Sequence, residues 1–102
     1  MLPKPDEVQI VIHDQPISGV LQLDAWLRSQ MDAATAIFMG RVRDVAMDGR
    51  PLEALELSHY PGLCERLIEA SARQLLLHHG GRSAVVLHRV GRLLSGELIV
   101  LV

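Results

Sequence analysis

The sequence is poor in lysine, cysteine and aromatic residues, and each shortage excludes a class of function. The 102 residues include one lysine, one cysteine and one each of Trp, Tyr and Phe. A single cysteine, Cys64, cannot form an internal disulfide. Three aromatic residues are too few for a platform on which nucleic-acid bases stack. The formal net charge of -2 gives no basic footprint for nucleic acid either.

The single lysine, Lys4, lies between two prolines near the N-terminus. A mechanism that needs a buried lysine with a lowered pKa therefore has no obvious candidate. The N-terminal residues lack the basic-then-apolar profile of a signal peptide, and no apolar run approaches the ~20 residues of a membrane span. We expect a cytoplasmic protein with no membrane contact.

What remains is typical of one globular domain spanning residues 1–102. Hydrophobic residues make up 49% and charged residues 22% of the chain, which separates it from disordered sequences. Alternating β-branched and apolar residues predict strands at 8–13, 34–44, 52–59, 83–90 and 97–102. Helical spacing of apolar residues predicts helices at 20–30 and from Pro61 to about Gly80.

The predicted order is β-α-β-β-α-β-β, an α+β fold with helices packed on a mostly antiparallel sheet. On the first helix, Leu23, Trp26 and Leu27 are expected on the buried side. The Asp48-Gly49 pair is a strong hairpin signal, so strands 34–44 and 52–59 are predicted to pair with each other.

The most suggestive chemical feature is a pair of arginines, Arg41 and Arg43, separated by Val42. On a strand, residues two apart lie on the same side, so the two guanidinium groups would face one anion. Arg89 and Arg92 would join this patch if their strand is a neighbour. The alternative is that these arginines only keep a sheet edge soluble.

The histidines and the cysteine give weaker signals. His78 and His79 end a predicted helix, where such residues are ordinary. Since no His-x-x-x-His or Cys-x-x-Cys spacing occurs, we expect no metal site and no bound cofactor. His59 and His88 are candidates for hydrogen bonding or acid-base chemistry. Cys64 sits near a helix N-terminus, but packing is the simpler interpretation because no partner base is evident.

Three motifs in register resemble the large, catalytic subunit of molybdopterin synthase, the MoaE family. The family pattern reads approximately F-x-G-x-V-R, then L-x-x-E-H-Y-x-G-M, then H-R-I-G-x-L-x-x-G-[DE]-x-x-V. The matching residues here are Phe38, Gly40, Val42, Arg43, His59, Tyr60, Gly62, His88, Arg89, Val90, Gly91, Leu93, Gly96, Glu97 and Val100. Order and spacing match across nearly the whole chain, which makes the resemblance specific.

The resemblance implies an α/β hammerhead fold and a reaction. The family inserts two sulfurs into cyclic pyranopterin monophosphate to make the dithiolene of molybdopterin. A small ubiquitin-like subunit supplies each sulfur as a thiocarboxylate on its C-terminal glycine, and two large subunits form the centre of a heterotetramer. By the same resemblance, Arg41, Val42 and Arg43 are substrate contacts and Phe38 lines the pocket.

The departures from the family pattern are also informative. Ser58 replaces the usual Glu, and Leu63 replaces the usual Met. The resemblance implies that the family's C-terminal third, with its catalytic lysines, has no match in this chain, and Lys4 matches none of them. We therefore predict no catalytic residue here and an inactive chain as written. The alternatives are a non-catalytic paralogue that binds a partner or a pterin phosphate, and an unrelated regulatory module for an anionic ligand.

Overall fold

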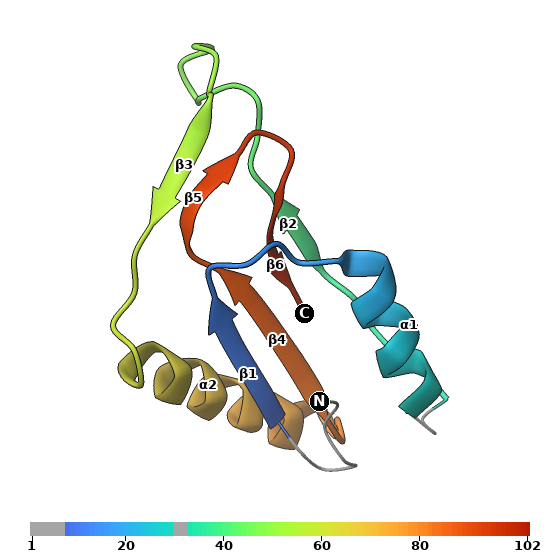
Figure 1. The fold of residues 1–102 in the computed structure, drawn as a ribbon. Helices are drawn as coiled ribbons and strands as arrows, with labels where there is room; N and C mark the ends of the chain where they lie inside the picture. Colours follow the sequence, from blue (N-terminus) through green and yellow to red (C-terminus); the bar gives the residue numbers. More distant parts are fainter. Residues whose placement is uncertain (1–7, 30–32) are drawn as a thin grey trace.

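The computed structural model describes residues 8–29 and 33–102, which form two helices and six strands (Figure 1). Lys4 and Gln30 lie outside the described residues. The strands are β1 (Val8–His13), β2 (Met39–Arg41), β3 (Ala54–Leu57), β4 (Ala84–Arg89), β5 (Gly91–Leu94) and β6 (Leu98–Leu101). The helices are α1 (Gly19–Ser29) and α2 (Leu63–His79).

The main sheet has four strands in the order β1-β4-β6-β2. Strand β1 runs parallel to β4, whereas the β4–β6 and β6–β2 pairs are antiparallel. Parallel neighbours need a long crossover, and here the connection includes both helices (Figure 1). The buried apolar residues of the described chain lie on or beside these strands and β5: Val8, Val42, Val86, Leu87, Leu93 and Leu101.

The second sheet pairs β3 with β5 in antiparallel register, from Ala54↔Leu94 to Leu57↔Gly91. The chain leaves β4 and enters β5 within two residues, because Gly91 adopts a φ of 91° that turns the backbone out of the main sheet. Since three of the four strand pairings are antiparallel, the predicted α+β fold with a mostly antiparallel sheet is confirmed.

The two helices cover opposite faces of the main sheet. Helix α2 packs on β1 and approaches Ile10, whereas α1 lies over the side that carries Leu87 (Figure 1). Ile10 is paired with Val86 in the β1–β4 ladder, and Val86 precedes Leu87. Because successive strand residues face opposite sides, Ile10 and Leu87 lie on opposite faces of the sheet. Neither helix among the described residues is long and apolar enough to cross a membrane.

Helix α2 follows its predicted range and ends where Gly80 takes a left-handed conformation, with its N–H bonded to the carbonyl of Leu76. Helix α1 matches its prediction in range but not in burial. Leu23 and Trp26 are half-buried, whereas Leu27 is exposed. The prediction that Leu27 faces the core is therefore wrong: Leu23 and Trp26 face the cavity beneath α1, and Leu27 does not line it.

The predicted hairpin between residues 34–44 and 52–59 is wrong in its pairing. A tight turn does form at Asp48-Gly49, closed by a bridge between Val45 and Pro51. Beyond that bridge the strands separate, and β2 pairs with β6 while β3 pairs with β5. The Asp48-Gly49 pair correctly indicates a turn. The strands on either side of the turn pair with more distant strands instead of with each other.

Two further strands differ from the prediction: one is shorter than expected, and one was not expected at all. The expected strand 34–44 is reduced to Met39–Arg41, since the structure leaves residues 34–37 outside any ladder. Strand β5 was not predicted, because its four residues follow directly after β4 and the kink at Gly91 carries no hydrophobic signature.

Leu93 and Leu94 offer a matched test of this arrangement, since they are adjacent in β5 and face opposite sides. Leu93 is 0% exposed and Leu94 is 48% exposed. We expect Leu93→Ala to lower the free energy of unfolding by about 2–5 kcal/mol, because it opens a cavity in a filled site. Leu94→Ala should change it by less than about 0.5 kcal/mol. Urea denaturation measures both, and equal losses would contradict the placement of β5.

Candidate functional site

The arginine segment, residues 41–43, runs beside the turn that precedes β6. The backbone N–H of Val42 donates to the carbonyl of Glu97 at 2.9 Å, and the N–H of Gly96 donates to the carbonyl of Val42 at 2.8 Å. Val42 is 4% exposed, whereas Arg41 and Arg43 on either side are exposed. The chain thus holds Val42 inward and directs both arginines outward, as the alternating sequence predicts.

Both arginine side chains are available to a ligand. Among the residues that the structure describes, neither Arg41 nor Arg43 makes a side-chain hydrogen bond or an ion pair. A guanidinium group carries five N–H donors in a planar fork that matches a phosphate or carboxylate. Two such forks on one short segment can share one anion.

Phe38 stands at the start of the same segment. Its backbone exchanges two hydrogen bonds with Val102, each 2.8 Å long, which continues the β2–β6 pairing by one residue. Its exposed ring lies beside Gly40, within 3.7 Å of where a Cβ on that glycine would be. A Cβ there would also come within 3.0 Å of Val100 Cγ1, so glycine lets the strands approach closely. Phe38 therefore presents an exposed apolar ring on the strand that leads into the arginine segment.

Arg89 and Arg92 do not extend this patch as free cations. The Arg89 side chain is only 11% exposed and forms an ion pair with the carboxylate of Glu97. Arg92 lies on β5 in the second sheet and faces Glu56 on β3, with 3.5 Å between its Nη1 and the carboxylate oxygen. The condition that their strands neighbour β2 is met by neither residue, because β6 lies between β4 and β2 and β5 belongs to the second sheet.

The Arg89–Glu97 pair lies next to the arginine segment, because Glu97 contacts both Arg89 and Val42. Its carboxylate pairs with Arg89 at the end of β4, and its carbonyl accepts the N–H of Val42. The ion pair therefore holds the residue against which the arginine segment is bonded. Arg89 thus contacts the residue that pairs with Val42, and its guanidinium is engaged by Glu97.

The histidines have structural neighbours. His59 Nε2 lies 3.7 Å from Oε1 of Glu65, and the other oxygen of Glu65 accepts the N–H of Gly62 at 2.8 Å, which caps α2. His88 Nδ1 lies 3.0 Å from the carbonyl oxygen of Arg89. Within the described chain, no group of three or more His, Cys, Asp or Glu side chains is placed to hold a metal.

His78 and His79 stack edge to face at the end of α2, with ring centroids 4.8 Å apart. Cys64 is a half-buried free thiol in the first turn of α2. The two histidines and the cysteine all lie on α2, and none of the contacts described above joins them to residues 41–43.

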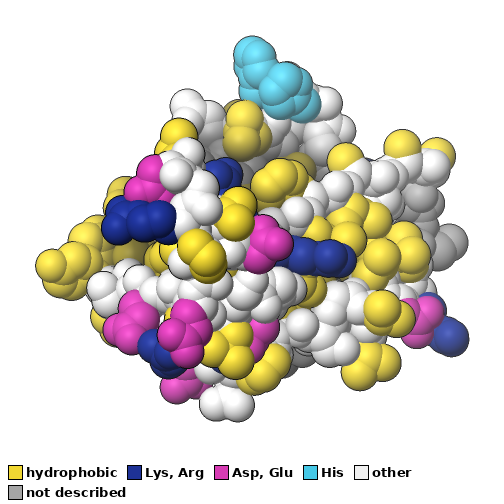
Figure 2. Space-filling view, turned by 90° about the horizontal axis from the view of Figure 1, so that it is seen from above, with side chains coloured by type: hydrophobic (Ala, Val, Ile, Leu, Met, Phe, Trp, Pro, Cys, Tyr) yellow, Lys and Arg dark blue, Asp and Glu magenta, His cyan; other side chains and the backbone are white. Residues whose placement is uncertain are grey.

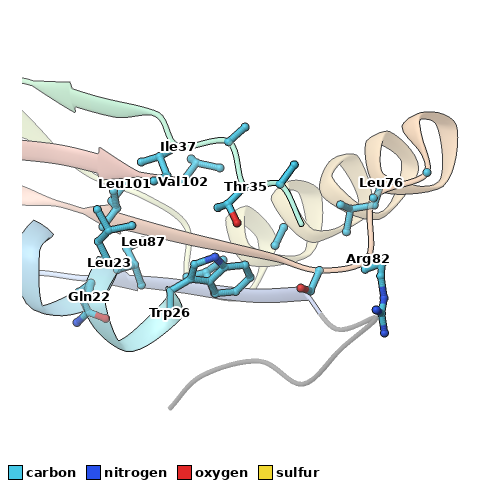
Figure 3. Close-up of a pocket in the computed structure, with 17 residues that line it drawn as sticks. Gln22, Leu23, Trp26, Thr35, Ile37, Leu76, Arg82, Leu87, Leu101 and Val102 are labelled. Atoms are coloured by element: carbon cyan, nitrogen blue, oxygen red, sulfur yellow. The ribbon is translucent and has the colours of Figure 1, made fainter. Parts of the chain in front are cut away.

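A cavity of about 500 Å³ lies elsewhere in the fold (Figure 3). Figure 3 shows Leu23 and Trp26 of α1 facing Leu87 and Leu101 of the main sheet, with Leu76 of α2 at the far end. None of Phe38, Arg41, Val42 or Arg43 lines it. Sequence reasoning missed this cavity, because it arises where a helix packs loosely and no local pattern encodes that.

Comparison with known proteins gives one consistent result. A family model described as "MoaE protein" matches residues 12–102. The "Molybdopterin synthase catalytic subunit" of Haemophilus influenzae is 36% identical over 99 residues, covering 94% of this chain and 63% of that protein. The protein of the same name from Escherichia coli is 34% identical over 97 residues, with the same coverage of both chains.

Solved structures agree with the sequence matches. The "Molybdopterin biosynthesis MoaE protein from Burkholderia ambifaria MC40-6" superposes with a TM-score of 0.77 at 33% identity, covering 92% of this chain and 60% of that one. A Burkholderia multivorans protein superposes with a TM-score of 0.76 at 30% identity. The chain thus spans about three fifths of the length of the relatives it matches, 60% to 63% in these cases.

The Arg89–Glu97 pair generates a prediction about stability. We expect Glu97→Gln to lower the free energy of unfolding by about 2 kcal/mol, because it leaves the mostly buried Arg89 guanidinium without its counter-charge. The amide of Val42 should also exchange faster with solvent. Urea denaturation and hydrogen exchange measure the two effects.

The matched control is Glu56→Gln, which breaks the exposed pair with Arg92. Exposed pairs contribute little, so this change should remain below about 0.5 kcal/mol. Identical effects of the two substitutions would show that the Arg89–Glu97 pair holds nothing in place.

Proposed function

This chain belongs to the MoaE family, and from that premise we propose that it serves as the catalytic subunit of molybdopterin synthase in molybdenum cofactor biosynthesis. The proposed substrate is cyclic pyranopterin monophosphate, which receives two sulfurs to become molybdopterin. The proposed enzyme class is a sulfurtransferase. Within this chain, the proposed substrate contacts are Arg41, Val42, Arg43 and Phe38.

One observation carries the binding part of the proposal: two exposed arginines, without side-chain partners among the described residues, flank a residue that the backbone holds in place. The substrate is a phosphate ester with a flat ring system. Arginine forks complement the phosphate oxygens, and the exposed ring of Phe38 offers an apolar surface to the pterin. Because the supporting backbone bonds are already made, the backbone of this segment loses little conformational entropy when the arginines engage.

The proposed sulfur donor is a small ubiquitin-like subunit with a thiocarboxylate on its C-terminal glycine, and two copies of the large subunit are proposed to form the central dimer. Support for both partners comes from family membership. The open backbone edges of β2 and of the two-strand sheet are also compatible with further pairing.

The proposed role of this 102-residue chain by itself is binding without turnover. Its one lysine, Lys4, lies outside the described residues and matches no lysine of the family pattern. The same observation favours the second candidate, a non-catalytic paralogue that binds a partner or a pterin phosphate. Incubating the chain with the thiocarboxylated small subunit and the cyclic precursor tests this, since formation of molybdopterin would contradict binding without turnover.

The arginine site leads to a binding prediction. We expect Arg41→Ala and Arg43→Ala each to weaken binding of cyclic pyranopterin monophosphate at least about 10-fold, because each removes a charge-assisted contact worth roughly 1.5 kcal/mol or more. Isothermal titration calorimetry measures the affinities. The double substitution should remove measurable binding.

Arg73→Ala is the matched control, since Arg73 is an exposed arginine on α2 that lies 3.5 Å from Glu69. It should leave the affinity unchanged. If the double substitution at positions 41 and 43 binds the precursor as tightly as this control, the site assignment is wrong.

A further inference from the structure

Strand β5 is an excursion that leaves the main sheet and returns to it. The chain departs after Arg89, the last residue of β4, runs through β5 in the second sheet, and returns at Glu97, just before β6 (Figure 1). The side chains of these two residues form an ion pair. The pair therefore joins the two ends of the excursion, and we call it the clasp.

The clasp lies just beyond the end of the ladder between β4 and β6. Within the described chain, that ladder pairs Leu87 with Leu101 and His88 with Val100, and it stops there. At the next step toward the excursion, the two sides are joined through the clasp instead. The returning end of the excursion is thus tied to β4 by a charge pair rather than by a continued backbone ladder.

The pairing of β6 with β2 is irregular at the same place. Its register shifts immediately before Arg41, which pairs with Leu98. Past the shift, the N–H of Val42 donates to the carbonyl of Glu97 at 2.9 Å, and the N–H of Gly96 donates to the carbonyl of Val42 at 2.8 Å. The arginine segment is therefore bonded to the returning end of the excursion, whose link to β4 is the clasp.

Arg89 contacts both the end and the middle of the excursion. Its Nη1 pairs with the carboxylate of Glu97, and its Nη2 donates to the carbonyl of Arg92 at 3.4 Å. The side chain of Arg89 is 11% exposed and that of Glu97 is 32% exposed. A pair largely removed from water attracts more strongly, and salt screens it less, than a pair on the open surface.

Net charge does not explain where an anion would bind at this end of the molecule. The chain carries a formal charge of -2. Figure 2 looks onto the end where Figure 1 places the excursion, and it shows acidic side chains beside basic ones. Affinity for an anion then depends on how well Arg41 and Arg43 are placed, and so on the backbone that carries them.

We propose that Arg89 and Glu97 are positioning residues for the anion site at Arg41 and Arg43. Neither contacts the ligand. The clasp fixes the returning end of the excursion, and that end fixes the backbone of Val42, so the two flanking guanidinium groups engage a phosphate from an ordered backbone. This inference rests on the proposed function, since it takes the arginine segment to be the phosphate site.

Glu97→Gln separates positioning from electrostatics, because the two predict opposite signs. The substitution keeps the size of the side chain and removes a negative charge, so charge alone would tighten the binding of an anion. Loss of the clasp should instead weaken binding of cyclic pyranopterin monophosphate at least about 5-fold, because the segment must then become ordered on binding. Isothermal titration calorimetry measures the affinity.

Arg89→Lys is the second variant, and it leaves the net charge unchanged. A lysine ammonium is a single point charge and does not reproduce the fork that reaches both Glu97 and the carbonyl of Arg92. We expect the affinity to fall at least about 3-fold. Adding Glu97→Gln to this variant should weaken binding no further than Glu97→Gln alone, because both substitutions break the same pair.

Two control variants match these changes. Glu56→Gln makes the same chemical change in the exposed pair with Arg92, outside the clasp, and should leave the affinity within about 2-fold. Val8→Ala controls for lost stability, since Val8 is 7% exposed and lies on β1, at the edge of the main sheet opposite β2. It should lower the free energy of unfolding without changing the affinity. Circular dichroism confirms that all variants are folded.

Unchanged or tighter binding by Glu97→Gln would overturn the proposal, and so would equal weakening by Val8→Ala. Failure of the unsubstituted chain to bind the precursor would contradict the proposed function instead. Amide exchange of Val42 without ligand then decides the role of the clasp by itself. Exchange as slow in Glu97→Gln as in the unsubstituted chain would show that the clasp positions nothing.

Discussion

The pairing of residues 38–42 with residues 96–102 is the constraint on which the rest of the structure depends. Four backbone hydrogen bonds of 2.8–2.9 Å mark its two ends, at Phe38 with Val102 and at Val42 with Gly96 and Glu97. This pairing completes the main sheet at β2, with a register shift between Gly40 and Arg41, and it leaves Arg41 and Arg43 exposed on either side of the buried Val42. Because Glu97 is also the partner of Arg89, the ion pair and the backbone ladder hold the same point.

The same pairing explains which parts of the fold were predictable from sequence. The Val8–His13 strand and helix α2 have strong local periodicity, and the structure confirms them. The partner of β2 was not predictable, because Asp48-Gly49 signals a turn without specifying how far its strands stay together. The alternation Arg41-Val42-Arg43 matches the exposed–buried–exposed order of these residues, and a shared anion site at the two arginines stays a prediction. The roles of Arg89 and Glu97 were not, since their contact depends on the long-range register.

The thin core is the second consequence of this architecture. Leu93 is the only large side chain of the described residues that is fully buried, and α1 has no buried residue. A body with so little enclosed apolar area gains little hydrophobic free energy on folding. The arginine segment is less affected, because its supports are backbone hydrogen bonds and one ion pair rather than side-chain packing.

The most direct test of the central claim is an NMR titration of the arginine Nε–Hε groups with cyclic pyranopterin monophosphate. If the sheet register holds Arg41 and Arg43 ready for the phosphate, their two resonances shift together and saturate at one equivalent. The resonance of Arg89 then stays in place, because its guanidinium remains paired with Glu97. Shifts at Trp26 and the other residues of the cavity, with Arg41 and Arg43 unmoved, would contradict the claim and place the ligand on the α1 side of the molecule.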